Sequence, residues 1–126
     1  MIRPSGAVRV MLATRPVDFR RGMDGLAALV RDAMGAAPLS GTVYVFRSKR
    51  PDRVKLLVWD GSGLVLATKR LEASQFYWPK IEDGVIWLSA AQLAALVEGL
   101  NWKRVHAARA GGCRLSKKAG KRASSQ

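Results

Sequence analysis

Short apolar runs along the chain, some alternating with polar residues and others rich in β-branched and aromatic residues, predict a series of strands. The expected strands cover residues 8–13, 42–46, 54–59, 64–68 and 85–88. Asp60-Gly61 lies between two of these runs and is a strong hairpin signal. Residues 75–79 are aromatic-rich and end in a proline, so they are expected to be extended.

Two stretches have the apolar spacing of amphipathic helices. In the first, Asp18 is expected to cap a helix that begins near Phe19, with apolar residues three and four positions apart. The second has clearer ends: Ser89 and Gln92 match a capping box, and Gly99 stands where a glycine commonly ends a helix. Together with the strands, these helices predict an α+β fold: a small, mostly antiparallel sheet with two helices on one face.

The periodic pattern ends near Arg104. We expect residues 1–104 to form a single domain and residues 105–126 to be a mobile basic tail, because the latter consist mainly of Ala, Gly, Ser and cations without periodicity. The single cysteine, Cys113, excludes an intrachain disulfide. No apolar run approaches the roughly 20 residues that span a bilayer, and no secretory leader is visible. A cytoplasmic protein without a membrane partner is therefore expected.

Charge is the one extreme property of the composition. The chain has 22 Lys and Arg against 9 Asp and Glu, which gives a formal net charge of +13. Such a field attracts polyanions, and nucleic acid is the commonest of these in cells. No acidic residue follows Glu98, so the C-terminal segment carries a large share of the excess.

The predicted hairpin region, residues 46–71, is strongly basic. Its acids between Phe46 and Leu71 are Asp52 and Asp60, whereas its cations are Arg47, Lys49, Arg50, Arg53, Lys55, Lys69 and Arg70. This bias favours an anionic partner, either a phosphate backbone or an acidic protein. Aromatic residues lie among these cations, as in surfaces that stack unpaired bases. Phe46 and Trp59 are expected in the core, whereas Trp78 is a candidate contact with a base or a partner.

Residues for catalysis or metal binding are nearly absent from the sequence. His106 is the only histidine, so neither a Cys/His zinc site nor a histidine-activated nucleophile is expected. Asp18, Asp24 and Asp60 could form the acidic set of a metal-dependent phosphoryl-transfer enzyme. Each has a simpler role, however, in a helix cap, on a polar helix face or in a turn. We therefore expect no enzyme, no metal, no cofactor and no small-molecule substrate.

An ordered series of motifs resembles one family of bacterial mobile-element proteins. Over roughly Val8 to Lys103, the chain is similar to the TnpB-type, Orf2-like accessory protein of the insertion-sequence family numbered sixty-six. The matching pieces are Asp18-Phe19-Arg20-Arg21-Gly22-Met23-Asp24-Gly25-Leu26, Ser40-Gly41, Val45-Phe46-Arg47, Asp52-Arg53-Val54-Lys55, Trp59-Asp60-Gly61, Lys69-Arg70-Leu71-Glu72, Trp78-Pro79, Leu88-Ser89, Gln92-Leu93 and Glu98-Gly99. Ala67 and Thr68 depart from the family pattern, where aromatic residues are common, and the segment after Lys103 is not part of that pattern.

The resemblance implies a protein that assists transposition beside a separate transposase and is not itself the acid-triad transposase. Two hypotheses for its function follow. The first is a DNA-binding accessory factor that uses the basic hairpin. The second is a protein adaptor that docks onto the transposase through this hairpin and through the helix bearing Gly22 and Gly25, without specific DNA binding.

Overall fold

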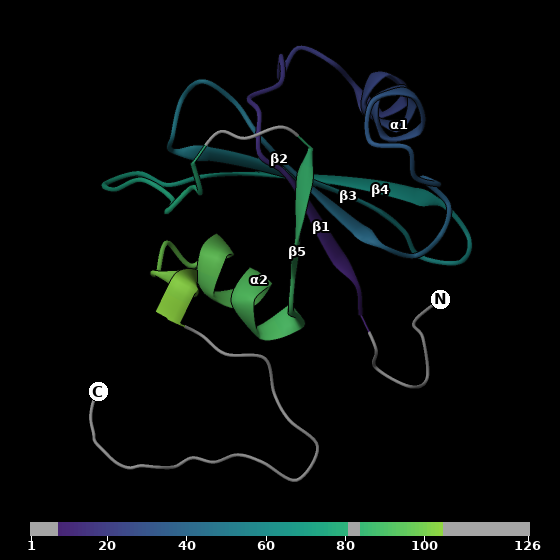
Figure 1. Ribbon diagram of the computed structural model, residues 1–126. Helices are drawn as coiled ribbons and strands as arrows, with labels where there is room; N and C mark the ends of the chain where they lie inside the picture. The colour runs from purple at the N-terminus through teal and green to yellow at the C-terminus, as the bar shows by residue number, and fades with distance from the viewer. Residues whose placement is uncertain (1–7, 81–83, 105–126) are drawn as a thin grey trace, which may run out of the picture.

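The computed structural model describes residues 8–80 and 84–104, which form a five-stranded mixed sheet and two α-helices (Figure 1). In chain order the elements are β1 (Val10–Ala13), α1 (Met23–Asp32), β2 (Val43–Arg47), β3 (Arg53–Trp59), β4 (Leu64–Arg70), β5 (Val85–Leu88), α2 (Ala90–Val97) and the short 3-10 helix η1 (Trp102–Arg104). The strand order is β4-β3-β2-β1-β5, and the β1–β2 pair is parallel whereas the other three pairs are antiparallel. The predicted α+β fold is confirmed. The predicted tail, residues 105–126, lies outside the described residues.

The two helices cover opposite faces of the sheet, so the prediction that both lie on one face is wrong. Val10 and Leu12 of β1 belong to the core cluster beneath α2, whereas Met11 and Ala13 belong to the cluster beneath α1. Figure 1 shows the helices on either side of the sheet. The physical reason is that every residue of β1 is apolar and buried. Because successive side chains of a strand point to opposite faces, such a strand needs cover on both.

One local prediction fails, at the start of the first helix. Helix α1 begins at Met23 with Gly22 as its N-cap, and Asp18 does not cap it. Instead the Asp18 carboxylate accepts hydrogen bonds from the backbone and side chain of Arg20 and stabilises a turn ahead of the helix. Residues 75–79 do not join the sheet. There the backbone N–H of Phe76 donates to the carbonyl of Pro51 at 3.0 Å.

Helix α2 is capped as the sequence predicts. Gln92 N donates to Ser89 Oγ at 3.0 Å, and Ser89 N donates to Gln92 Oε1 at 2.9 Å, so the capping box is complete. At the other end Gly99 has φ of +78°, and the N–H groups of Gly99 and Leu100 donate to the carbonyls of Leu96 and Ala95. This is the Schellman arrangement, in which glycine takes the left-handed position without steric penalty.

Replacing Ser89 by alanine should lower the free energy of unfolding by about 1 kcal/mol, because an N-cap acceptor is lost. Urea denaturation followed by circular dichroism measures this change. Ser74→Ala is a suitable control, since the Ser74 side chain is exposed in a loop, and it should change stability by less than about 0.5 kcal/mol. Equal losses in the two variants would contradict the capping role.

Three loop segments meet at one end of the sheet, which we call the loop end. Because β1 and β2 are parallel and their neighbours antiparallel, β1, β2 and β4 finish there and β3 begins there. The loop end therefore holds residues 14–22, 48–52 and 71–80. Val17 N donates to Arg47 O at 2.8 Å and Leu71 N donates to Asp52 O at 2.9 Å, so these segments are tied to one another.

Candidate nucleic-acid interface

The seven hairpin cations are divided between both faces of the sheet and the β2–β3 loop. Arg47 and Lys69 are the cross-strand neighbours of Val54, whose side chain packs in the core cluster beneath α2. Arg53 is paired with Arg70, one residue along from the pair of Val54 and Lys69. Successive side chains of a strand point to opposite faces, so Arg53 and Arg70 lie on the face that α1 covers. The sequence predicts one basic surface, but in the structure five of these cations contact groups of their own chain. These five are Arg47, Arg53, Lys55, Lys69 and Arg70.

Arg47 is half-buried against the aromatic segment after β4. Its guanidinium lies 5.2 Å from the centre of the Trp78 ring, and Nη1 donates to Pro79 O at 3.3 Å. Burial lowers the pKa of Arg47, because removal from water disfavours the charged form. Arg47 thus holds residues 78–79 against the sheet.

Lys55 and Lys69 each donate to backbone carbonyls. Lys55 Nζ lies 2.7 Å from Phe19 O and 3.4 Å from Arg21 O, and it also lies 5.0 Å from the centre of the Phe19 ring. On the other face, Lys69 Nζ donates to Val97 O at 2.7 Å. This carbonyl is at the C-terminus of α2, where the helix dipole favours a cation. Both lysines therefore fasten loops or helices to the sheet.

Arg53 and Arg70 form a like-charged cross-strand pair, an arrangement that is destabilising by itself. Each has an acid beside it. Arg70 donates to Glu72 Oε2 at 3.1 and 3.2 Å, and Arg53 Nε lies 3.7 Å from Asp52 Oδ1. The acids reduce the repulsion between the two guanidinium groups and lower the net charge of this surface.

Lys49 and Arg50 differ from the other five. Both are exposed, and within residues 8–80 and 84–104 neither side chain has a hydrogen-bond or ion-pair partner. The backbone that carries them is fixed, because Ser48 Oγ accepts from Arg50 N and donates to Arg50 O, each at 3.0 Å. A fixed loop with two free cations is well suited to contact an anion.

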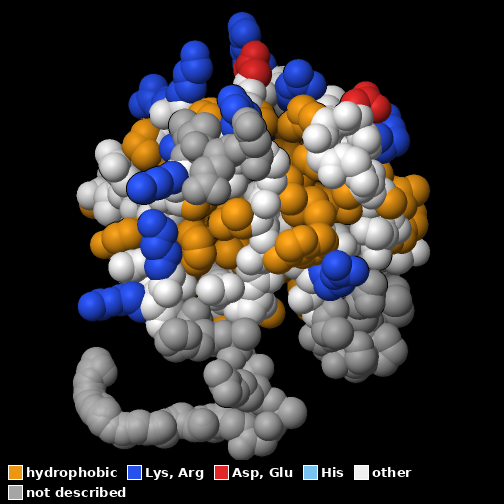
Figure 2. All heavy atoms as spheres, in the orientation of Figure 1, with side chains coloured by type: hydrophobic (Ala, Val, Ile, Leu, Met, Phe, Trp, Pro, Cys, Tyr) orange, Lys and Arg blue, Asp and Glu red, His pale blue; other side chains and the backbone are white. Residues whose placement is uncertain are grey.

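Hollows lie on both sides of the Lys49–Arg50 loop. One, of about 400 Å³, lies between residues 16–20 and 48–50 and also contacts Arg53. The other, of about 500 Å³, lies between residues 49–52 and 71–75 and contains the acids Asp52 and Glu72. We call the first the basic groove, since its cations are Arg20, Lys49, Arg50 and Arg53 and its acid is Asp18. Figure 2 shows Lys and Arg side chains crowded along the upper and left margins of the visible face.

Arg20 lines the basic groove, although it is not among the site residues that the sequence predicts. Its side chain is 92% exposed and forms a bidentate pair with Asp18, with Nη2 to Oδ2 at 2.9 Å. The side-chain hydrogen bonds from Arg20 lower the pKa of Asp18 to about 2. The adjacent cations Arg20 and Arg21 were the feature of the sequence that could have indicated this site. The fold, however, is what brings Arg20 close to the Lys49–Arg50 loop, which lies far from it in the sequence.

The aromatic residues are mainly structural. Phe46 is fully buried and Trp59 is half-buried. Trp78 is half-buried, donates from Nε1 to Pro51 O at 3.1 Å and packs 5.7 Å from the Phe76 ring. The more exposed rings are those of Tyr77 and Trp87, and the Arg9 guanidinium lies 4.5 Å from the Trp87 ring centre. Stacking on Trp78 would therefore require this packing to open.

The three acids considered for metal chemistry are not grouped. Asp60 Oδ1 accepts hydrogen bonds from Ser62 N, Ser62 Oγ and Gly63 N, which stabilise the β3–β4 turn and lower the pKa of Asp60. Within the part of the chain that the structure describes, no three His, Cys, Asp or Glu side chains are placed to hold a metal ion. The same residues contain no helix long and apolar enough to cross a membrane.

The sequence of this chain matches a known family and two known proteins. Residues 8–107 match the family described as IS66 Orf2-like protein. Protein y4jC of Sinorhizobium fredii (strain NBRC 101917 / NGR234) is 51% identical over 105 residues, which cover 83% of this chain and 90% of that protein. Protein y4hO of the same strain is 42% identical over 101 residues, or 79% of this chain and 88% of that protein. No solved structure gives a significant match.

Proposed function

The chain belongs to the IS66 Orf2-like family of transposition accessory proteins, and from this premise we propose that it is a non-catalytic factor that binds DNA through the Lys49–Arg50 loop. The observation that carries the proposal is the state of these two side chains. They are exposed on a loop fixed by Ser48, and they lack partners among the described residues. The net charge of +13 adds long-range attraction to a polyanion.

The loop would contribute a modest and sequence-independent part of the affinity. Phosphate contacts position a protein on DNA but do not read its sequence. Two contacts account for a slope of about −1.8 in the logarithm of affinity against the logarithm of salt on duplex DNA. Arg47, Lys55 and Lys69 are less suited to this role, because each would have to leave a carbonyl of its own chain.

A protein adaptor that docks onto the transposase is the second candidate. It is favoured by the environment of Gly22 at the start of α1. A Cβ at this position would meet nothing within 4 Å, so packing inside the chain does not account for the glycine. The neighbouring Met23 is 36% exposed. A partner that approaches this backbone closely would explain both features.

Reversing both charges, in a Lys49→Glu/Arg50→Glu variant, should weaken DNA binding for all sequences alike and flatten the salt slope by about 2. Fluorescence anisotropy with labelled element-end DNA and with unrelated DNA, over a range of salt concentrations, measures both effects. Lys103→Glu/Arg104→Glu is the matched control, since it changes the same residue types and the same charge on η1. The control should have a smaller effect on binding.

The adaptor hypothesis predicts a different result for the same pair of variants. DNA affinity and salt slope would be equal in the loop variant and the control, and the loop variant would fail to capture the transposase of the same element. That outcome would contradict DNA binding through the loop. Thermal unfolding of both variants checks that the fold is retained, which is expected because Lys49 and Arg50 are exposed.

A further inference from the structure

We propose that the basic groove takes a single strand of nucleic acid, with Arg20 contacting a phosphate opposite Lys49 and Arg50. This inference rests on the proposed DNA-binding function and names the kind of DNA and an additional contact residue. The groove has a volume of about 400 Å³, at the small end of the range for ligand pockets, about 300–1,000 Å³.

The two walls of the basic groove are held in place before any ligand binds. Val17 N donates to Arg47 O at 2.8 Å, which joins the chain before α1 to the end of β2. Lys55 Nζ donates to Phe19 O at 2.7 Å and fixes the same segment to β3. Preformed walls reduce the entropy that binding has to overcome. The groove is thus a built feature of the loop end.

The charged residues that line the basic groove are mostly cationic. The groove contacts four cationic residues and one acid, and that acid, Asp18, is already paired with Arg20. Exposed ion pairs of this kind contribute little to stability. Arg20 can therefore leave the Asp18 carboxylate and bind a phosphate with little loss of stability. Its planar guanidinium group also matches the geometry of a phosphate. The second hollow beside the loop contains Asp52 and Glu72, so its charges are mixed and it is a poorer anion site.

The apolar lining favours a single strand over a duplex. Pro16, Val17 and Phe19 line the groove together with its cations, and all three are half-buried. Unpaired bases stack on aromatic and apolar side chains while cations follow the backbone. A duplex keeps its bases inside, so it could meet only the cations. Phe19 is half-buried against the core cluster beneath α1, and Lys55 Nζ lies 5.0 Å from its ring centre, so a base would contact the part of the ring that lines the groove.

Two substitutions with opposite expected effects test the role of Arg20 in the full chain. Arg20→Gln should weaken binding of a labelled oligodeoxythymidylate about fivefold at 0.1 M salt, the effect of one single-strand contact with a slope of about −0.7. Asp18→Asn should strengthen binding, because it removes an ionised carboxylate and releases Arg20. A purely structural ion pair would make both variants bind more weakly. Arg31→Gln, on the last turn of α1 and outside the groove, is the charge-matched control.

The preference for single strands has its own test. Phe19→Leu keeps an apolar side chain but removes the ring, so it should reduce affinity for the oligodeoxythymidylate at least about fivefold and leave affinity for a duplex of equal length unchanged. Equal loss on both, or no effect of Arg20→Gln beyond that of Arg31→Gln, would overturn the groove proposal. The proposed function would survive either result if Lys49→Glu/Arg50→Glu still weakened DNA binding. The proposed function itself would be contradicted if Lys49→Glu/Arg50→Glu had no effect on DNA binding.

Discussion

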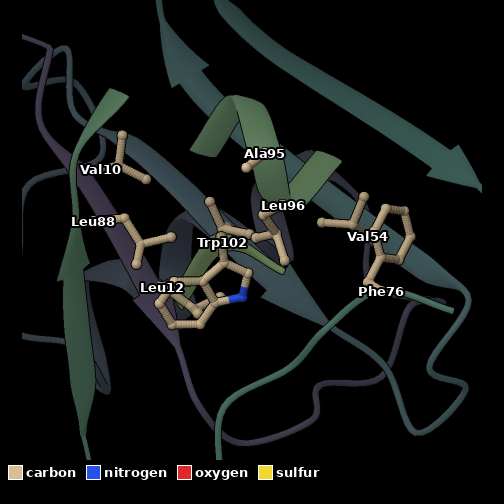
Figure 3. Packing of buried hydrophobic residues seen from close by; sticks show 9 residues of the cluster. Val10, Leu12, Val54, Phe76, Leu88, Ala95, Leu96 and Trp102 are labelled. Atoms are coloured by element: carbon tan, nitrogen blue, oxygen red, sulfur yellow. The ribbon is translucent and has the colours of Figure 1, made fainter. Parts of the chain in front are cut away.

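A Trp102→Ala variant should lose about 3–5 kcal/mol of the free energy of unfolding, the usual range for truncating a large buried aromatic residue. Trp102 is 6% exposed and packs in the core cluster beneath α2 with Leu12 and Leu96 (Figure 3). Its indole N–H donates to the carbonyl of Tyr77. Small domains have only about 5–15 kcal/mol in total, so the thermal midpoint should fall by about 12 °C or more.

Trp87→Ala is the matched control for this prediction. Trp87 is 51% exposed on β5, where the Arg9 guanidinium packs against its ring. Loss of that contact should reduce stability by only about 0.5–1 kcal/mol. Chemical denaturation of both variants gives the comparison. Similar losses of the free energy of unfolding would mean that burial of Trp102 contributes little to the stability of the core. A chain that ends before η1 should then fold as well as one that ends at Arg104.

Deletion of residues 105–126 should produce the largest change in nonspecific DNA binding. This segment contains six cations and no acid: Arg109, Arg114, Lys117, Lys118, Lys121 and Arg122. If each contacts one phosphate, the salt slope on duplex DNA should become shallower by as much as about 5. Affinity at low salt should fall accordingly, whereas the thermal midpoint should barely change, because the segment lacks the apolar periodicity of a packed element.

A full-length chain with these six cations replaced by glutamine separates charge from chain length. It should bind DNA as weakly as the truncated protein, since counterion release depends on charge. Retention of strong binding in this variant would contradict the electrostatic role. Cooperative loss of structure on deletion would show that the domain extends beyond Arg104.

The sequence by itself determined most of the local structure. Strand positions followed from apolar runs, and both ends of α2 followed from Ser89, Gln92 and Gly99, because capping and turn formation depend on a few neighbouring residues. Asp60-Gly61 placed the β3–β4 turn for the same reason. The family was also visible in the sequence, as an ordered series of motifs that spans the matched region.

Only the tertiary structure decided how these elements face one another and which cations remain free. The helices lie on opposite faces because β1 is apolar on both sides, whereas the local pattern led to the wrong prediction that both lie on one face. The start of α1 was mispredicted because Asp18 bonds to Arg20 instead of the helix. A count of charges cannot show that Lys55 and Lys69 bind carbonyls distant in sequence. Nor can it show that Arg20 lies beside Lys49 and Arg50, because that proximity arises when parallel β1 and β2 end together.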